Sequence, residues 1–138
     1  MHGHARQFMN ARVVVTFPHT TLEQAARELA RLEVSGLPVV DQIGQVAGQV
    51  VGIVTESDLL SALLHAVSAD TPISTIMTEC VVTVDEFASA DSVIRLLREK
   101  HLHHLPVTRR GVVVGLITPQ DLIHYFVSHE LPLPPEVA

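Results

Sequence analysis

Cysteine, aromatic side chains and long apolar runs are all scarce in this sequence of 138 residues. The single cysteine, Cys80, has no partner for an internal disulfide, which excludes a disulfide-stabilised fold and indicates a reducing compartment. No run approaches the ~20 apolar residues that span a bilayer, and residues 1–12 lack the apolar segment of a signal peptide. We therefore expect a cytoplasmic chain with no direct membrane insertion, whether it stands alone or is a portion of a larger or membrane protein.

Basic side chains are scarce as well. Nine Lys and Arg residues stand against fifteen Asp and Glu residues, which gives a net charge of −6 with neutral His. Proteins that hold a phosphate backbone are normally basic, so nucleic acid is a disfavoured partner. Apolar residues make up 47% of the chain and charged residues 17%, which is ample material for a buried core.

The sequence lacks the signatures of common catalytic sites. It has no Walker-type glycine loop and no Gly-x-Ser-x-Gly, and Cys80 has no recognisable catalytic context. Nine histidines invite a metal hypothesis, and three of them cluster at 101, 103 and 104. On an extended stretch His101 and His103 would face one way and His104 the other, and no His-Glu-x-x-His occurs. We expect no catalytic residues, no metal site and no required cofactor.

What the chain does contain is an internal duplication. An offset of 68 residues places Met9 on Met77, and it places the Leu-Pro-Val at 37–39 on the same tripeptide at 105–107. The offset then falls to 63, because the first copy has five extra residues within 41–49, where a longer hairpin loop is expected. The predicted units are 5–68 and 69–129, followed by a flexible proline-rich tail at 130–138.

Each unit switches from strand-like to helix-like periodicity in the same order. Short β-branched runs predict strands, and apolar residues at helical spacing behind Thr or Ser caps predict helices. Neither unit of about 65 residues buries much core alone, so we expect an α+β fold of two β-α-β-β-α repeats, packed through their sheets about a pseudo-twofold axis. The expected strands are 13–16, 37–40, 50–54, 81–84, 105–108 and 112–117; the expected helices are 21–35, 56–67, 89–101 and 119–129, with a short helical turn at 71–77.

One motif occurs in both units at the junction of a strand and a helix. Residues 52–58 and 115–121 both follow the pattern Gly-x-x-Thr-x-x-Asp. Thr at a helix start followed three residues later by Asp is a capping box, which needs no ligand. The same corner also gathers a hydroxyl, a carboxylate and free backbone N–H groups, which together suit a polar ligand. Both interpretations stay open at this point.

Together these features resemble a tandem pair of CBS domains, also called a Bateman module. The resemblance rests on the two corner motifs, the two Leu-Pro-Val tripeptides, and Ile76-Met77 followed by Val81-Val82-Thr83-Val84, and it covers about residues 5–129. It implies a twofold module that often dimerises, senses an adenosine compound such as AMP, ADP, ATP or S-adenosylmethionine, and regulates an attached or associated enzyme or transporter.

The resemblance also implies a set of ligand-binding residues. Asp58 and Asp121 are the candidates for the ribose, because a carboxylate can accept hydrogen bonds from both hydroxyls of a 2′,3′-diol. Thr55 and Thr118 would contact ribose or phosphate. The adenine slots would be lined by the first strands and by the residues before each Pro; these are Thr16, Val84, Leu37 and Leu105, for each of which plain core packing is the competing interpretation.

His103 and His104 precede the second Leu-Pro, where related modules often place basic residues that contact phosphate. The first unit has Ser35 and Gly36 at the corresponding place. We therefore expect the Asp121 site to handle phosphates better than the Asp58 site; a surface location of the two histidines is the alternative.

The leading functional hypothesis is a non-enzymatic sensor of an adenosine nucleotide that changes inter-repeat or dimer geometry to control a partner or an attached domain. The alternative is a ligand-free structural dimerisation module.

Overall fold

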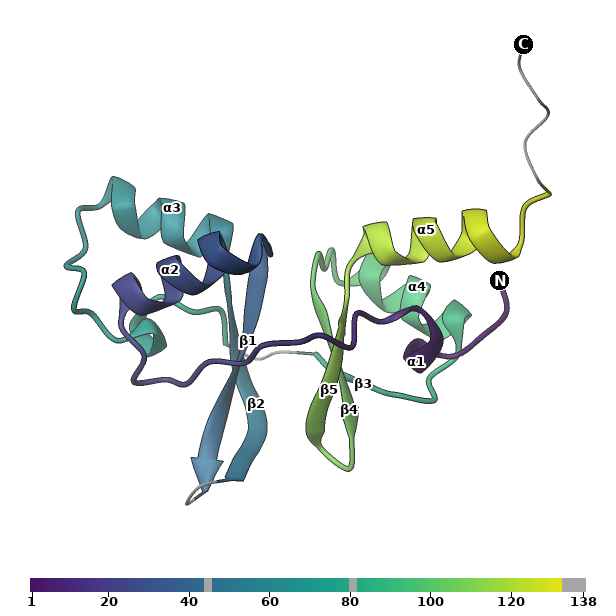
Figure 1. The fold of residues 1–138 in the computed structure, drawn as a ribbon, viewed down its shortest axis with the longest axis horizontal. Helices are drawn as coiled ribbons and strands as arrows, with labels where there is room; N and C mark the ends of the chain where they lie inside the picture. The colour runs from purple at the N-terminus through teal and green to yellow at the C-terminus, as the bar shows by residue number, and fades with distance from the viewer. Residues whose placement is uncertain (44–45, 80–81, 133–138) are drawn as a thin grey trace, which may run out of the picture.

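The computed structural model describes residues 1–43, 46–79 and 82–132. It shows an α+β fold in two halves, each with a small sheet that faces the other half and helices on the outside (Figure 1). The first half contains α2 (Leu22–Leu32), β1 (Gly36–Ile43), β2 (Val46–Thr55) and α3 (Glu56–Leu64). The second contains β3 (Val84–Asp85), α4 (Ala90–Glu99), β4 (Leu105–Arg109), β5 (Val112–Ile117) and α5 (Pro119–His129). The predicted fold class is confirmed.

The helices begin where their caps predict. Thr21 accepts a hydrogen bond from the N–H of Gln24 and caps α2, and Ser89 does the same for α4. Pro119 occupies the first turn of α5, where its missing N–H costs nothing. The helix predicted at 21–35 ends earlier, at Leu32, and the next residue, Glu33, caps it in the left-handed conformation (φ 55°, ψ 39°).

Two sheets form, one in each half. In the first, β1 and β2 are antiparallel; in the second, β3 is parallel to β4, which is antiparallel to β5. The five extra residues of the first unit lengthen both strands of its hairpin, with irregularities after Val39 and Val40, so the predicted longer loop is wrong for its described part. Positions 44 and 45 lie outside the described residues.

The first strands of both units are shorter than predicted. Of 13–16, only Thr16 forms a bridge, parallel to Val39. Of 81–84, Val84 alone is in a strand, and position 81 lies outside the described residues, as do Cys80 and the tail from 133 onward. The predicted helical turn is the 3-10 helix η1 (Ile73–Thr75).

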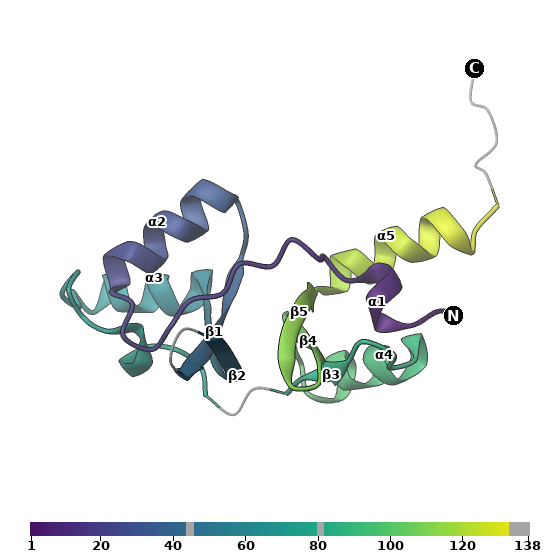
Figure 2. The same cartoon turned by 60° about the horizontal axis from the view of Figure 1, so that its bottom comes forward.

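The two halves exchange their leading segments. The short helix α1 (Ala5–Phe8) packs against the second half, and η1 packs against the first. The contacts match: Ala5 N–H donates to the carbonyl of Ala88 at 2.9 Å, and Ile73 N–H donates to that of Thr20 at 2.8 Å. The chain then crosses between the halves before α2 (Figure 2).

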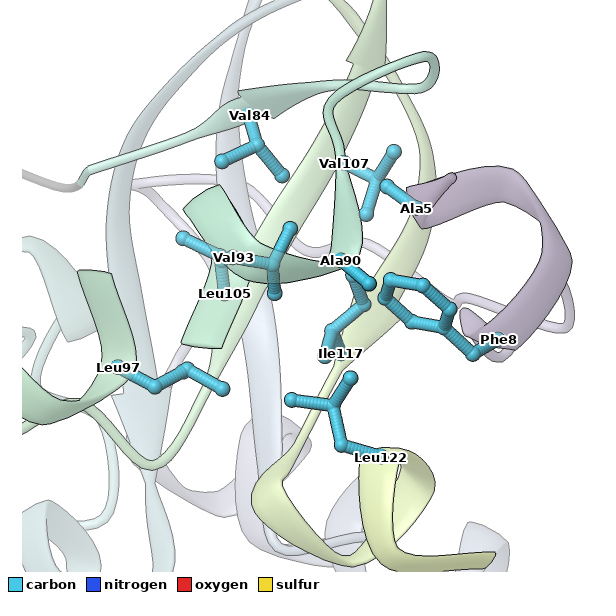
Figure 3. Close-up of a cluster of buried hydrophobic side chains, with 10 residues drawn as sticks. All are labelled: Ala5, Phe8, Val84, Ala90, Val93, Leu97, Leu105, Val107, Ile117 and Leu122. Atoms are coloured by element: carbon cyan, nitrogen blue, oxygen red, sulfur yellow. The ribbon is translucent and has the colours of Figure 1, made fainter. Parts of the chain in front are cut away.

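Each half has its own core because of this exchange. In the second half, Ala5 and Phe8 of α1 lie among side chains of α4, α5 and the sheet (Figure 3). In the first half, Ile73 is fully buried among side chains of α2, β1 and α3. Each spatial half thus includes a leading segment that belongs to the other sequence unit. The boundaries 5–68 and 69–129 therefore describe the repeats in the sequence, and they stay predictions. Within the described residues, no helix has the length and apolar character needed to cross a membrane.

Candidate functional site

The two corner motifs form the same structure at the start of α3 and of α5. Thr118 caps α5 and accepts from the N–H of Asp121 at 3.4 Å. In return, Oδ2 of Asp121 accepts from the Thr118 N–H at 2.8 Å and from its hydroxyl at 3.0 Å. Thr55 and Asp58 repeat the arrangement with distances of 2.9 and 3.0 Å. The capping box predicted as the ligand-independent alternative is therefore present at both corners.

The capping box uses only one carboxylate oxygen. Within the described part of the chain, Oδ1 of Asp121 has no hydrogen-bond partner. Oδ1 of Asp58 accepts only a long bond, 3.4 Å, from the hydroxyl of Thr78. Each capping box therefore leaves the second carboxylate oxygen outside the cap.

Asp121 lies at one end of a cleft between the two halves. A cavity of about 180 Å³ beside Asp121 and Thr118 is also lined by Glu33, Ser35 and Leu116, among others. It adjoins a larger cavity of about 290 Å³, since Asn10, Val34, Gly36 and Leu116 border both; the larger one is further lined by Arg12, Val13, Val14, Leu32 and Leu37. An apolar slot therefore leads to a polar end that holds a carboxylate.

The N-terminal segment forms one wall of this cleft because it pairs with β5. Asn10 and Leu116 exchange backbone hydrogen bonds of 2.8 and 3.1 Å. Just before it, Met9 packs on Gly115, where an added Cβ would lie 2.8 Å from Met9 Cγ. The matching pair is Met77 on Gly52. The glycine of each corner motif thus lets a methionine segment lie flat against the strand.

The opposite wall is the rim between α2 and β1. Glu33 holds its left-handed conformation here, which few residues other than glycine adopt readily. Ser35 connects the two halves, since its hydroxyl lies 2.6 Å from Nε2 of His104. Gly36 makes room for that imidazole, because a Cβ at this position would lie 3.0 Å from His104 Cδ2.

The structure places His104 on the Asp58 side. Burial lowers the pKa of His104 below its ordinary value of 6.5, and the neighbouring His103 acts in the same direction. The carboxylates of Glu56 and Asp58 oppose this shift, so the imidazole lies in the electrostatic field of the α3 corner. His103 is exposed. His104 also contacts Ser35, which lines the cavity beside Asp121, so the roles of both histidines in phosphate binding stay predictions.

The four residues predicted for the adenine slots are all buried. Leu37 lines the larger cavity of the Asp121 cleft. Both backbone polar groups of Thr16 are hydrogen-bonded: its N–H donates to the Pro38 carbonyl and its carbonyl accepts from the Val40 N–H, each at 2.9 Å. Val84 and Leu105 pack in the core of the second half. Of the four, Leu37 is thus brought together with Asp121.

The Asp58 corner is described in part. Asp58 borders a cavity of about 290 Å³ lined also by Ser61, His65, Thr75 and others of the first half. The positions that match Arg12 and Val13 in the other unit are 80 and 81, which lie outside the described residues.

Asn10, Arg12 and Glu33 line the cleft but were not singled out from the sequence. The sequence does offer a signal for Asn10. This residue follows Met9 as Thr78 follows Met77, so the repeat places a polar residue at the same position of both units. Among the described residues, no three His, Cys, Asp or Glu side chains are arranged to hold a metal ion.

Comparison with protein families matches the CBS domain twice, at residues 5–65 and 67–128. The chain belongs to the CBS domain family. Its relatives include the uncharacterized protein YlbB of Bacillus subtilis, 36% identical over 103 residues, which cover 72% of this chain and 66% of YlbB. The inosine-5′-monophosphate dehydrogenase of Mycobacterium leprae is 36% identical over 108 residues, which are 77% of this chain but 19% of that enzyme. The chain thus spans just under two thirds of YlbB and about a fifth of the dehydrogenase.

Solved CBS domain structures have the same fold. CBSX2, solved in complex with AMP, is 26% identical, with a TM-score of 0.77 over 91% of this chain and 96% of that one. The CBS domain pair of protein MJ0100, solved in complex with 5′-methylthioadenosine and S-adenosyl-L-methionine, is 26% identical, with a TM-score of 0.78 over 90% of this chain and 99% of that one. Adenosine compounds are the common element of these two complexes.

Proposed function

We propose that the chain is a regulatory module that binds an adenosine compound in the cleft beside Asp121. The proposal depends on one observation about the Asp121 carboxylate. Its Oδ2 completes the helix cap, whereas its Oδ1 has no hydrogen-bond partner in the described structure. A ribose diol is the part of an adenosine compound that matches such an acceptor.

The cleft has the shape that the rest of the ligand requires. The larger cavity is walled by Val14, Leu37 and Leu116, which suit the flat apolar faces of a purine. Asn10 borders both cavities and offers polar groups at the edge of the slot. The AMP complex of CBSX2 and the adenosyl complexes of the MJ0100 pair support the assignment of the ligand class.

The module acts as a sensor rather than a catalyst. Its cleft is built from both halves, so a bound ligand favours one relative arrangement of the halves, which an attached or associated enzyme or transporter reads. Coupling of this kind is typically about 1–3 kcal/mol, which changes the affinity of a partner about 5- to 150-fold. The dehydrogenase relative, in which the matched part is 19% of the chain, supports a module attached to an enzyme.

Isothermal titration of the protein with AMP, ATP, S-adenosylmethionine and 5′-methylthioadenosine tests the proposal. Saturable binding of at least one compound, weakened at least about tenfold in the double variant Asp58→Asn/Asp121→Asn, supports it. The absence of saturable binding up to millimolar concentrations would leave the ligand-free structural module as the function.

The proposed assembly is a homodimer formed through α3 and α5. Both helices expose apolar side chains at matching positions, 63 residues apart: Leu60, Leu63 and Leu64 on α3, and Ile123, Phe126 and Val127 on α5, with 41–82% of each residue exposed. Figure 1 shows the two helices along the same edge of the molecule. A surface that repeats itself about a pseudo-twofold axis suits an isologous contact with a second copy.

Light scattering coupled to size exclusion tests the dimer. We expect a dimer mass for the protein and a monomer mass for Leu63→Glu/Phe126→Glu. Val112→Glu is the matched control, because Val112 is equally apolar and 44% exposed but lies on β5. A monomeric wild-type protein, or a double variant that remains dimeric, would contradict this assembly.

A further inference from the structure

We infer that the Asp121 cleft selects adenosine compounds whose 5′ substituent is uncharged or positive, and that Glu33 excludes phosphate from it. This inference rests on the proposed function and concerns the ligand class of the same cleft. It reverses the expectation from sequence that the Asp121 site would be the better phosphate site.

The charges around the cleft are separated along its length. Glu33 and Asp121 both border the smaller cavity, whereas Arg12 borders only the larger one. Of the described residues that line the two cavities, Arg12 alone is positively charged. In the proposed binding mode the base lies in the apolar slot and the ribose beside Asp121, which directs the 5′ group into the smaller cavity. A phosphate there meets two carboxylates and no lining cation.

The start of α5 does not compensate for this. Helix N-termini bind phosphate through unpaired N–H groups. Here Pro119 has no N–H, and the N–H groups of Thr118 and Asp121 are both used within the capping box. The helix dipole remains, but most of the donors that would hold a phosphate oxygen are occupied or missing.

The position of Glu33 is fixed by the backbone. Glu33 is the left-handed residue at the end of α2, and the matching residue of the second unit, His101, is left-handed as well, with φ values of 55° and 53°. The two units therefore share a conformation at this rim but differ in its charge. Glu33 borders the smaller cavity together with Asp121, whereas its counterpart His101 belongs to the rim that carries His104.

The measurement is the ratio of dissociation constants for AMP and 5′-methylthioadenosine, two ligands that share adenine and ribose. Isothermal titration is performed in the Asp58→Asn background, so that one corner contributes. We expect the thioether compound to bind more tightly than AMP. Exposed charges interact weakly, so Glu33→Gln should improve AMP binding about two- to fivefold, and Glu33→Lys should improve it further, with little change for the thioether. Glu28→Gln, the same change one and a half turns earlier on α2, should leave the ratio unaltered.

Each result decides the question. AMP binding at least as tight as that of the thioether, or a ratio unchanged in both Glu33 variants, would overturn the inference while leaving the proposed function intact. Binding to the wild type that disappears in the Asp58→Asn background would place the ligand at the other corner and also overturn it. If neither compound binds the wild-type protein, the proposed function itself fails, and the inference fails with it.

Discussion

Replacing Asp121 with Asn separates the structural role of this carboxylate from its proposed ligand role. The amide keeps a carbonyl oxygen for the Thr118 N–H, which lies 2.8 Å from Oδ2, so the cap persists. The loss of negative charge at the start of α5 costs about 0.3–1 kcal/mol of unfolding free energy. The ligand, by contrast, loses a charge-assisted hydrogen bond worth about 1.5–3 kcal/mol, which weakens binding about 10- to 150-fold.

The assay is titration with the tightest-binding adenosine compound, in the Asp58→Asn background, alongside urea unfolding of each variant. Thr21→Ala is the control for capping, because Thr21 caps α2 through the same kind of box, away from the cleft. It should cost about 0.5–2 kcal/mol of stability and leave the dissociation constant unchanged. Binding by Asp121→Asn within twofold of its parent would refute the role of Oδ1, and the carboxylate would be a helix cap alone.

Three further predictions concern stability. Gly52→Ala should lower the unfolding free energy by about 1–3 kcal/mol in urea titrations, because the added Cβ would lie 2.6 Å from Met77 Sδ. Adding Met77→Ala to this variant should restore part of the lost stability. An unchanged unfolding free energy in Gly52→Ala would contradict the close packing of Met77 on Gly52. The melting temperature of the wild-type protein should fall as the pH drops below 6.5, because burial lowers the pKa of His104 and the unfolded chain therefore binds a proton at this residue first. His104→Asn should make the melting temperature less dependent on pH in this range. An unchanged dependence would contradict the role of His104. The Arg109 guanidinium bonds the Glu86 carboxylate and lowers its pKa from 4.5, so this ion pair should stabilise the folded protein above that pH and cease to do so as the pH falls further. Glu86→Gln should therefore show a shallower acid unfolding transition by circular dichroism. An equally steep transition would contradict a stabilising ion pair.

Local features of the fold were predictable because their causes are local. The caps at Thr21, Ser89 and Thr118 each determine where a helix begins, and each is visible as a hydroxyl residue ahead of an apolar periodicity. The duplication was equally visible, since it requires only that the sequence be compared with itself. The β-branched runs located the paired strands β4 and β5 closely.

The arrangement of the site was not predictable in the same way, because it depends on contacts across most of the chain. Met9 packs on Gly115, and Asn10 pairs with Leu116, more than 100 residues away. Nothing in the periodicity of residues 1–12 shows that they belong to the second half. The contact of His104 with Ser35 was not predictable for the same reason, since the two residues belong to different units and lie 69 positions apart.

Glu33 illustrates a different limit. Its left-handed conformation is favoured by glycine, and a glycine three residues later at Gly36 suggested the end of the helix there instead. The close approach of the His104 ring to Gly36 explains why that position has no side chain. The glycine is thus a requirement of packing between the halves, which sequence patterns within one half do not report.

The exchange of leading segments has a consequence for regulation. The Asp121 cleft has walls from residues 10–14, from the rim at 33–37 and from the corner at 116–121, so it is complete only when both halves are in place. The Ser35 hydroxyl, on that rim, lies 2.6 Å from His104, whose imidazole lies in the field of Asp58. Under the proposed function, a ligand that moved the rim at one corner would therefore move a side chain near the other. Coupling of this kind is reciprocal. If ligands change the affinity of the module for the proposed partner, the partner changes the affinity of each ligand by the same factor by which that ligand changes its own.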